Sequence, residues 1–600
     1  MILFEHYHRL FSFYRETEVA RPISVTLEQV AAQLCCTRRN AAMTVKKLQQ
    51  RGWLDWRPGV GRGNASTITF RLHPQDVALS LAQELILRGD IREGQDFIAR
   101  YQEEWEGLGE AFQRWMDSQF GLHVRRGPDA RMDVLRLFAD QAVPVLDPAR
   151  VLLRSEANLV KHVFDGLIRF DSEKNQIEPG LAFYWELSED GKTYTFYLRK
   201  GVSFHHGRML TAEDVRFSLL RLGKQASPHR WLMDSIQDVV VIDPYIVQVH
   251  LHTPNYLFLQ ALSKEYAAIL PRDYTERMGE EFARMPVGSG PFRVVRNDDS
   301  MLVLEAFAPY FGGRPFLDRI ELWVVPEQTG PRSHAHADIP AIVYARPKHA
   351  GGGNHLQASG NSVACIEQCF QYLAVNLAKS GPLQDTAFRE VLDLILDQGE
   401  MLEELGGERK PSTRERIRAA EEARMKDSRI KGLLLGSSYQ GERLTLYTMP
   451  EYDHVEDAEW IQTRLQRYGI NLEIRYVPAA DLASSSLMRE ADLILDSANM
   501  DEREHLSILE FLFDDTAAPA HFLSPELRTR VRECVAQGVA QSDEKKRDQL
   551  WQEMMNLLVR ERLFFPLYSN FIEAIADERL GGLALSAYGW PDFCRIVVRT

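Results

Sequence analysis

The sequence predicts a multidomain α+β protein, and its length, composition and uneven distribution of charge support that prediction. The chain has 600 residues, more than one hydrophobic core usually organises. Hydrophobic residues make up 45% of it and charged residues 26%, as in soluble globular proteins. This composition excludes collagen-like chains, disordered low-complexity chains and small disulfide scaffolds.

Positive charge is concentrated at the N-terminus. The whole chain carries 71 Lys and Arg against 85 Asp and Glu, which gives a formal net charge of −14. Residues 1–72 hold 11 of the basic and 5 of the acidic residues, so this stretch carries +6 and the rest of the chain −20. Such segregation excludes a protein wrapped in nucleic acid along its length and indicates a small basic module at one end.

No membrane-spanning or secretory segment is predicted. The chain has no run of 18 apolar residues, and Glu5, His6 and Arg9 interrupt the apolar residues at its start. We therefore expect no membrane partner and a cytoplasmic location. The six cysteines form no C-x-x-C pair, which favours reduced thiols; they are Cys35, Cys36, Cys365, Cys369, Cys534 and Cys594.

Two helices joined by a short turn are predicted after the first 25 residues. Thr26 and Gln29 have the spacing of a capping box, and apolar residues continue at helical spacing to Leu34. Thr37 caps a second helix, which ends before Gly52.

A β-hairpin follows the two helices. Residues 53–56 and 66–71 have the pattern of strands, and the glycine-rich stretch 58–64 joins them. Helix, turn, helix and hairpin is the order of a winged helix-turn-helix, so we expect residues 1–72 to form a domain of this kind.

The second predicted helix has an apolar face and a basic face. At 100° per residue, Ala41, Val45 and Leu48 lie together on the core side. Arg can read guanine edges, Asn and Gln can read adenine edges, and Lys mostly binds phosphates. Eight basic residues against one acidic residue between positions 37 and 71 favour a double-stranded DNA operator as the partner, over a merely solvated face or a protein partner. The predicted DNA contacts are Thr37, Arg38, Arg39, Asn40, Met43, Lys46, Lys47 and Gln50 of the helix, with Arg57, Arg62 and Asn64 of the hairpin.

Residues 73–128 predict a helical connector. Their apolar residues fit either a coupling element between the two halves of the chain or a dimerisation surface, so a homo-oligomer is left open. The sequence Arg-Arg-Gly-Pro-Asp at 125–129 has the composition of a linker.

The remaining residues, 129–600, contain alternating strands, tight turns and capped helices. This succession resembles the large extracytoplasmic solute-binding proteins of the oligopeptide and nickel transport class, and the matching blocks include residues 286–292, 310–315, 372–376 and 460–473. The resemblance covers most of this stretch. It implies a two-lobed α/β module of the large type II periplasmic-binding class, with a ligand buried between the lobes.

The combination of both parts resembles the SgrR-type bacterial transcription regulators. Trp53-Leu-Asp-Trp56, Gly61-Arg-Gly63, Ser497-Ala-Asn499 and Gly589-Trp-Pro-Asp-Phe593 also look like that family. The resemblance implies a regulator that senses a small solute, such as a sugar phosphate or a peptide-like molecule. Aromatic and amide side chains in family-like blocks are the expected ligand contacts: Tyr372, Asn376, Asn499, Tyr588 and Trp590.

No catalytic or metal motif stands out, so we expect no enzyme activity, cofactor or metal. No Walker or H-E-x-x-H motif occurs. His205-His206 and His334-x-His336 with Asp338 lack the further ligands of a zinc site. Two alternative functions stay open, a solute-binding component of an ABC transporter and a signalling scaffold whose winged module binds protein.

Overall fold

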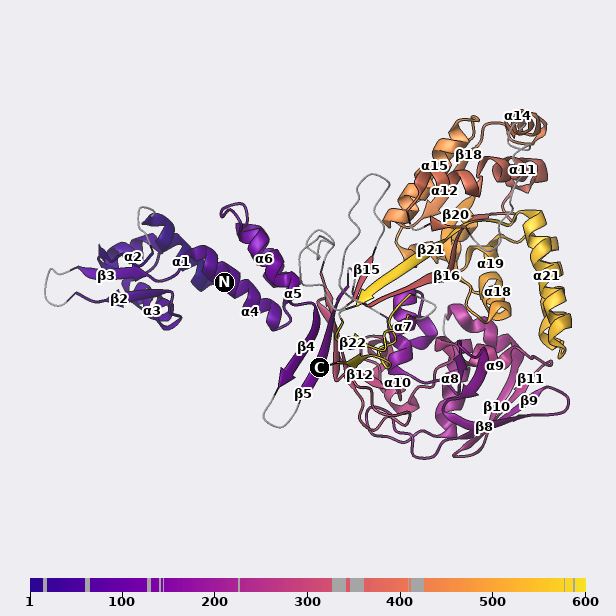
Figure 1. Ribbon diagram of the computed structural model, residues 1–600, viewed down its shortest axis with the longest axis horizontal. Coiled ribbons are helices and arrows are strands. Elements are labelled where there is room, and N and C mark those ends of the chain that lie inside the picture. Colours follow the sequence, from indigo (N-terminus) through magenta and orange to yellow (C-terminus); the bar gives the residue numbers. More distant parts are fainter. Residues whose placement is uncertain are drawn as a thin grey trace.

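The computed structural model has an elongated arm, built from residues 1–120, that projects from a larger body (Figure 1). In the described part of the chain, no helix is long and apolar enough to cross a membrane. The structure describes residues 1–600 except 15–18, 60–64, 127–130, 140–141, 144, 225–226, 326–341, 346–360, 408, 412–425, 577, 586–588 and 600, and it describes only the backbone of 125–126, 224, 342–345, 361–368, 452, 480 and 570–576.

The tip of the arm is a winged helix-turn-helix, as predicted. The Gln29 N–H donates to Thr26 Oγ1 at 3.2 Å, and the Thr26 N–H donates to Gln29 Oε1 at 2.8 Å, which completes the capping box. Thr37 Oγ1 accepts from the Asn40 N–H at 3.3 Å and begins the second helix. The elements are α1 (Ile2–Phe13), β1 (Ile23–Val25), α2 (Leu27–Gln33), α3 (Arg38–Gln50), β2 (Leu54–Arg57) and β3 (Ser66–Phe70), with the strand order β1-β3-β2.

The helix α1 was not predicted. Its residues Phe4, Tyr7 and Leu10 are three positions apart, and all three are fully buried. The Tyr7 hydroxyl donates to the carbonyl oxygen of Trp53 at 3.0 Å and to that of Leu72 at 2.6 Å. The interrupted apolar pattern at the start of the chain is therefore the buried face of an amphipathic helix.

The connector is helical up to residue 117, but residues 121–126 form a strand where a helix was predicted. The reason is long-range pairing, since β4 (Gly121–Arg126) runs antiparallel to β5 (Arg131–Ala139) and Gly121 stands opposite Arg136. The sheet of the body therefore begins within the predicted connector. The connector helices are α4 (Pro74–Leu87), α5 (Ile91–Tyr101) and α6 (Leu108–Asp117).

Lobe I comprises residues 121–325 together with 578–599. It has a five-stranded sheet of order β12-β13-β14-β5-β4, in which β14 and β5 are parallel, and a four-stranded sheet of order β10-β11-β9-β8. The remaining elements are α7 (Arg154–Val163), β6 (Ile168–Asp171), β7 (Gln176–Pro179), β8 (Ala182–Leu187), β9 (Thr193–Leu198), α8 (Ala212–Lys224), β10 (Ile236–Asp243), β11 (Ile246–Leu251), α9 (Phe258–Leu262), α10 (Arg272–Met278), β12 (Phe292–Asn297), β13 (Met301–Ala306), β14 (Arg319–Val324), β22 (Leu580–Gly581) and β23 (Val597–Val598).

Lobe II comprises residues 342–576 and is built on one large mixed sheet. The strand order is β15-β21-β16-β20-β18-β19, β17 pairs with β21, and β18 runs parallel to both β19 and β20. The elements are β15 (Ile342–Ala345), β16 (Asn361–Val375), α11 (Thr386–Ile395), α12 (Gln398–Leu405), β17 (Arg409–Lys410), α14 (Lys426–Gly436), β18 (Arg443–Thr448), α15 (Tyr452–Gln466), β19 (Asn471–Tyr476), α16 (Ala479–Leu482), α17 (Ser485–Glu490), β20 (Leu493–Asn499), α18 (Glu504–Phe513), α19 (Ala518–Phe522), α20 (Pro525–Ala540), α21 (Glu544–Glu561) and β21 (Phe564–Ala576).

The hydrophobic cores cross the boundaries between these parts. One core runs from the winged domain through the connector to Met301, Val303, Trp323 and Val325 on the lobe I sheet. A second core joins the four-stranded sheet of lobe I to lobe II. The arm and the body are therefore packed together through apolar side chains.

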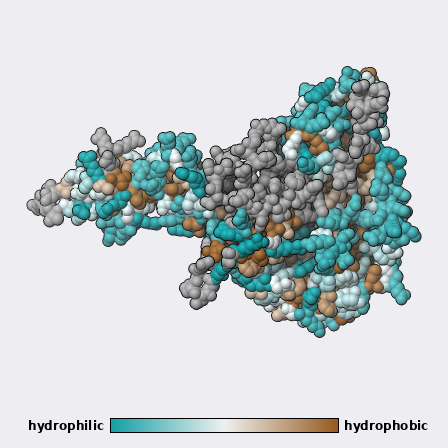
Figure 2. Space-filling view, viewed as in Figure 1, coloured by the Kyte–Doolittle hydropathy of each residue, from teal (hydrophilic) through white to brown (hydrophobic). Residues whose placement is uncertain are grey.

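On the face shown in Figure 2, hydrophilic residues cover much of the described surface, including that of α21.

Candidate functional site

The helix α3 turns its apolar face inward and its polar face outward. Ala41, Val45 and Leu48 are at most 2% exposed, as the helical wheel predicts. All the predicted DNA contacts of this helix are exposed: Thr37, Arg38, Arg39, Asn40, Met43, Lys46, Lys47 and Gln50.

Most of the cationic groups on this face are available to an external anion. Arg38 pairs with Glu28 of α2 at 3.0 Å, but both side chains are more than 60% exposed, so the pair is weak. Among the residues that the structure describes, no ion pair involves Arg39, Lys46 or Lys47. Arg57 is exposed on β2, whereas Arg62 and Asn64 lie outside the described residues.

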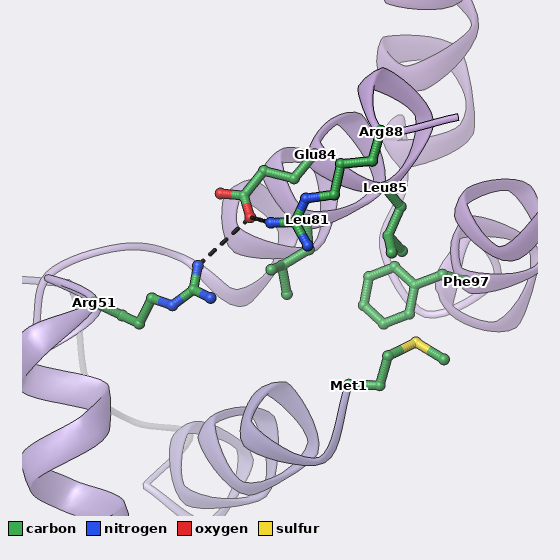
Figure 3. Close-up of a pocket in the computed structure, with 7 residues that line it drawn as sticks. All are labelled: Met1, Arg51, Leu81, Glu84, Leu85, Arg88 and Phe97. Atoms are coloured by element: carbon green, nitrogen blue, oxygen red, sulfur yellow. Dashed lines mark hydrogen bonds and ion pairs between the residues drawn. The ribbon is translucent and has the colours of Figure 1, made fainter. Parts of the chain in front are cut away.

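A polar bridge ties the end of α3 to the connector. Arg51 follows α3, and its Nη1 lies 3.5 Å from Glu84 Oε2 on α4; Arg88 Nη2 lies 3.5 Å from the same oxygen (Figure 3). These side chains border a small cavity of about 130 Å³, which Met1, Leu81, Leu85 and Phe97 also line. The contact places the end of α3 beside α4, but the two side chains are 51% and 44% exposed, so the pair itself is weak.

The same C-terminal end of α4 is held by lobe I. Arg296 of β12 donates from Nη2 to the Gly89 carbonyl oxygen at 3.0 Å and from Nη1 to the Arg88 carbonyl oxygen at 3.5 Å. Gly89 has a φ of +93°, and a Cβ at this position would lie 1.9 Å from Arg296 Nη1. A cation that donates hydrogen bonds to the last carbonyl oxygens of a helix is also favoured by the helix dipole. Polar contacts thus run from α3 to the sheet of lobe I.

Buried ion pairs join the two lobes. Lys264 of lobe I lies 3.0 Å from Asp501 and 2.9 Å from Glu510 of lobe II, and Arg503 donates to Ser263 Oγ at 3.0 Å. Burial by itself raises the pKa of the Asp501 carboxyl, but the charges of Lys264 and Arg503 hold it well below its usual range. His229 of lobe I pairs with Asp514 of lobe II at 2.8 Å.

Two of the predicted ligand contacts are used inside lobe II. Tyr372 is 1% exposed, and its ring lies edge-on to Phe511 at 5.0 Å between ring centroids. Asn376 donates to the carbonyl oxygens of Met488 and Ala491 and accepts from two backbone N–H groups, so its amide is fully engaged. Their role as ligand contacts stays a prediction, and the contacts described here are structural.

Polar side chains stand near the end of β20, with Asp496 and Asn499 on opposite faces of the strand because they are three positions apart. Asn499 ends β20, and its Oδ1 is buried without a hydrogen-bond partner among the described residues. Burial raises the pKa of the Asp496 carboxyl to about 6, and the positive charge of Arg154 at the start of α7 opposes the rise. Arg154 belongs to lobe I, so groups of both lobes approach each other here. Sequence reasoning missed Asp496 and Arg154, although a carboxylate inside the apolar run Leu493-Ile-Leu-Asp496 was a signal.

The two aromatic candidates lie near the C-terminus. Trp590 is half-buried in the segment that returns to lobe I after β21, whereas Asn499 belongs to lobe II. Tyr588 lies outside the described residues. The structure therefore assigns Asn499 and Trp590 to opposite lobes, and their role as ligand contacts stays a prediction.

Two groups of histidines were considered as metal ligands. The first contains His205, whose ring is used in structural contacts, and the second lies outside the described residues. The Gly288 N–H donates to His205 Nδ1 at 3.2 Å, and His205 Nε2 lies 2.9 Å from the Gly290 carbonyl oxygen. Both ring nitrogens of His205 therefore hold a turn. His334, His336 and Asp338 lie outside the described residues.

Comparisons with known proteins match both parts of the chain. Residues 3–121 match the family described as "Sugar transport-related sRNA regulator N-term", and residues 176–414 match "Bacterial extracellular solute-binding proteins, family 5 Middle". The chain is 33% identical over 605 residues to "Uncharacterized protein YhjP" of Bacillus subtilis (strain 168), covering 99% of each chain. It is 28% identical over 583 residues to the HTH-type transcriptional regulator SgrR of Yersinia enterocolitica, covering 95% of each chain.

Solved structures share the fold of the body. The murein tripeptide binding protein MppA of Escherichia coli superimposes with a TM-score of 0.66 at 20% identity, over 78% of this chain and 99% of that chain. The periplasmic binding protein AgaA of A. tumefaciens R10, in complex with agropinic acid, gives 0.65 at 18% identity over 78% and 99%. Since the N-terminal family, the solute-binding family and a relative that spans nearly the whole chain all agree, this protein belongs to the SgrR-type family of bacterial transcription regulators, which join a winged helix-turn-helix to a solute-binding module.

Proposed function

We propose that the protein binds double-stranded DNA through α3 and the β2–β3 hairpin, and that a small solute bound between the lobes changes its affinity for DNA. The observation that carries this proposal is the outer face of α3. Most of its exposed side chains are cationic or amide-bearing, and α3 contains no Asp or Glu. A regulator that acts on chromosomal DNA would work in the bacterial cytoplasm.

The residues of this face suit two different tasks on DNA. Arg39 and Asn40 lie in the first turn of α3, the part of a recognition helix that meets base edges in the major groove. Arg pairs with guanine and Asn with adenine through two hydrogen bonds each. Lys46 and Lys47 lie in the last two turns, where a flexible ammonium group reaches phosphates.

Polar groups at the lobe boundary support the solute part of the proposal. Asn499 offers an unpartnered buried acceptor, and Asp496 and Arg154 offer charges of both signs from opposite lobes. Trp590 supplies an apolar surface from the C-terminal segment. Such a mixture fits a small polar solute of peptide-like or sugar phosphate character, held by a few hydrogen bonds and one aromatic ring.

The test is DNA binding by the full chain with the DNA upstream of its own gene. The double variant Arg39→Ala/Asn40→Ala should lose preference for that DNA over a scrambled duplex, since each base contact contributes about 1–3 kcal/mol. The matched control is Arg100→Ala on α5, which removes an exposed positive charge away from α3. If the double variant keeps the full preference, α3 does not read the sequence.

A further inference from the structure

Three metal-ligating side chains meet where the C-terminal segment crosses lobe I. They are His162 of α7 and Asp592 and Cys594, which precede β23, and their ligand atoms all lie within 4.8 Å of one another. His162 and Cys594 are 432 positions apart in the sequence. The fold alone brings them together, so no spacing rule applied to the sequence could find them.

The distances fit a tetrahedral ion. Cys594 Sγ lies 3.7 Å from His162 Nδ1. Zinc binds sulfur at about 2.3 Å and imidazole nitrogen at about 2.0–2.1 Å, so a tetrahedral angle separates the two ligand atoms by about 3.6 Å. The Asp592 carboxylate is already oriented, because its Oδ1 accepts from the Cys594 N–H at 3.0 Å and its Oδ2 lies 3.3 Å from Arg595 Nε.

Packing fixes the imidazole in place. His162 is 4% exposed, and its ring packs 4.7 Å from that of Phe593 between centroids. The ring nitrogen that lies 3.7 Å from Cys594 Sγ is Nδ1. The other ring nitrogen, Nε2, is buried without a hydrogen-bond partner in the described part of the chain.

The donor set also matches the charge of a divalent ion. A coordinated thiol gives up its proton to solvent and binds as the thiolate. A thiolate and a carboxylate then offset the two charges of the ion.

We propose that His162, Asp592 and Cys594 bind one divalent transition-metal ion of the zinc type, with the fourth position left to water or an external donor. Sulfur, nitrogen and oxygen donors together suit zinc rather than magnesium or calcium. The ion would fasten the C-terminal segment to α7. The inference does not depend on DNA binding or on the solute.

The experiment uses the purified full chain, stripped of metals with a chelator and titrated with Co²⁺, which reports a bound thiolate through a charge-transfer absorption band. We expect one equivalent of Co²⁺ to develop this band and Zn²⁺ to remove it by displacement. Cys594→Ser should abolish the band, and because Cys594 is exposed the variant should keep its fold. Cys534→Ser, a matched change on α20, should leave the band intact.

A second measurement guards against misfolding of the buried-ligand variant. Zn²⁺ should raise the Tm of the stripped wild type. The His162→Gln variant should need at least a tenfold higher Zn²⁺ concentration for the same rise in Tm. A wild type that shows neither the cobalt–thiolate band nor a Zn²⁺-dependent rise in Tm would overturn the proposal. So would a band of undiminished intensity in Cys594→Ser.

Discussion

Individual residues of α3 differ in what they can contribute to DNA affinity. A lysine that binds phosphate adds affinity without reading sequence, because every duplex presents the same backbone. Lys46 and Lys47 are both exposed, and no described carboxylate pairs with either. Their contribution should therefore be visible in the salt dependence of binding rather than in sequence preference.

Replacement of Lys47 by Ala should weaken binding to operator and scrambled DNA by the same factor. The slope of log Kd against log salt concentration should fall by about one unit, since one fewer counterion is released. Lys431→Ala on α14, where the side chain is 68% exposed, is the control and should leave the slope unchanged. A loss confined to operator DNA would assign Lys47 to base reading instead.

Residue roles set by near neighbours could be predicted, and those set by distant ones could not. The caps at Thr26 and Thr37 are confirmed, because each acts on a backbone N–H three residues away. The proposed solute site depends on lobe II meeting α7 of lobe I, which no local pattern encodes. Asp496 and Arg154 were missed for that reason, and Asn376 carries a structural hydrogen-bond network that its block in the sequence did not reveal.

Among the elements, we expect the contact between the 3-10 helix Pro228–Ser235 and the end of α18 to depend on pH. His229 pairs with Asp514 across the lobes. Burial alone would lower the pKa of His229, but Asp514 and Glu510 outweigh it and raise the pKa above 6.5. A raised pKa means that the folded state holds the proton more tightly than the unfolded state. The contribution is complete below pH 6.5 and is lost as the pH rises through the raised value.

The His229→Gln variant should therefore lose a stabilising contribution that depends on pH. The difference in free energy of unfolding between wild type and variant should shrink between pH 6 and pH 8.5, as the wild-type imidazolium loses its proton. Denaturant titrations at several pH values measure it. His252→Gln, at an exposed position of lobe I, should show no such trend. A constant difference across this range would mean that the pair is held by hydrogen bonding alone.

Elements with strong local signals were predicted at nearly their observed bounds, whereas pairing partners were not. The helix α3 and the β2–β3 hairpin follow from caps, apolar spacing and glycine-rich turns. Residues 121–126 were assigned to the helical connector because nothing nearby marks them as a strand. Their pairing with β5 decides the outcome, and β5 itself is held by β14 from nearly 200 residues further along.

For the whole molecule, the question is how a change between the lobes reaches α3. Arg296 of lobe I hydrogen-bonds the backbone at the end of α4, and Glu84 of α4 pairs with Arg51, the residue that follows α3. Coupling of about 1–3 kcal/mol between two sites changes each affinity roughly 5- to 150-fold, and it must act in both directions. DNA bound at α3 should therefore alter the dynamics of lobe I.

Hydrogen exchange can measure this coupling without a known solute. Operator DNA should slow amide exchange in β12 and β13 of the wild type. The effect should vanish in Arg296→Ala, because alanine cannot donate the hydrogen bonds that Arg296 gives to the carbonyl oxygens of Arg88 and Gly89. Arg293→Ala, on the same strand but paired with Glu305, is the matched control and should retain the effect. If Arg296→Ala retains it as well, the shared apolar core carries the coupling.

The apolar core shared by the arm and lobe I determines where the chain can be truncated or its domains exchanged. Cutting the chain after the winged domain would leave the connector without its partner, and cutting after the connector would uncover Met301, Val303, Trp323 and Val325 on the sheet of lobe I. Exposed patches of that kind promote aggregation. A chimeric biosensor that exchanges the DNA reader while keeping the solute module must therefore transplant α1 to α6 as one cassette and preserve the sheet face on which it rests.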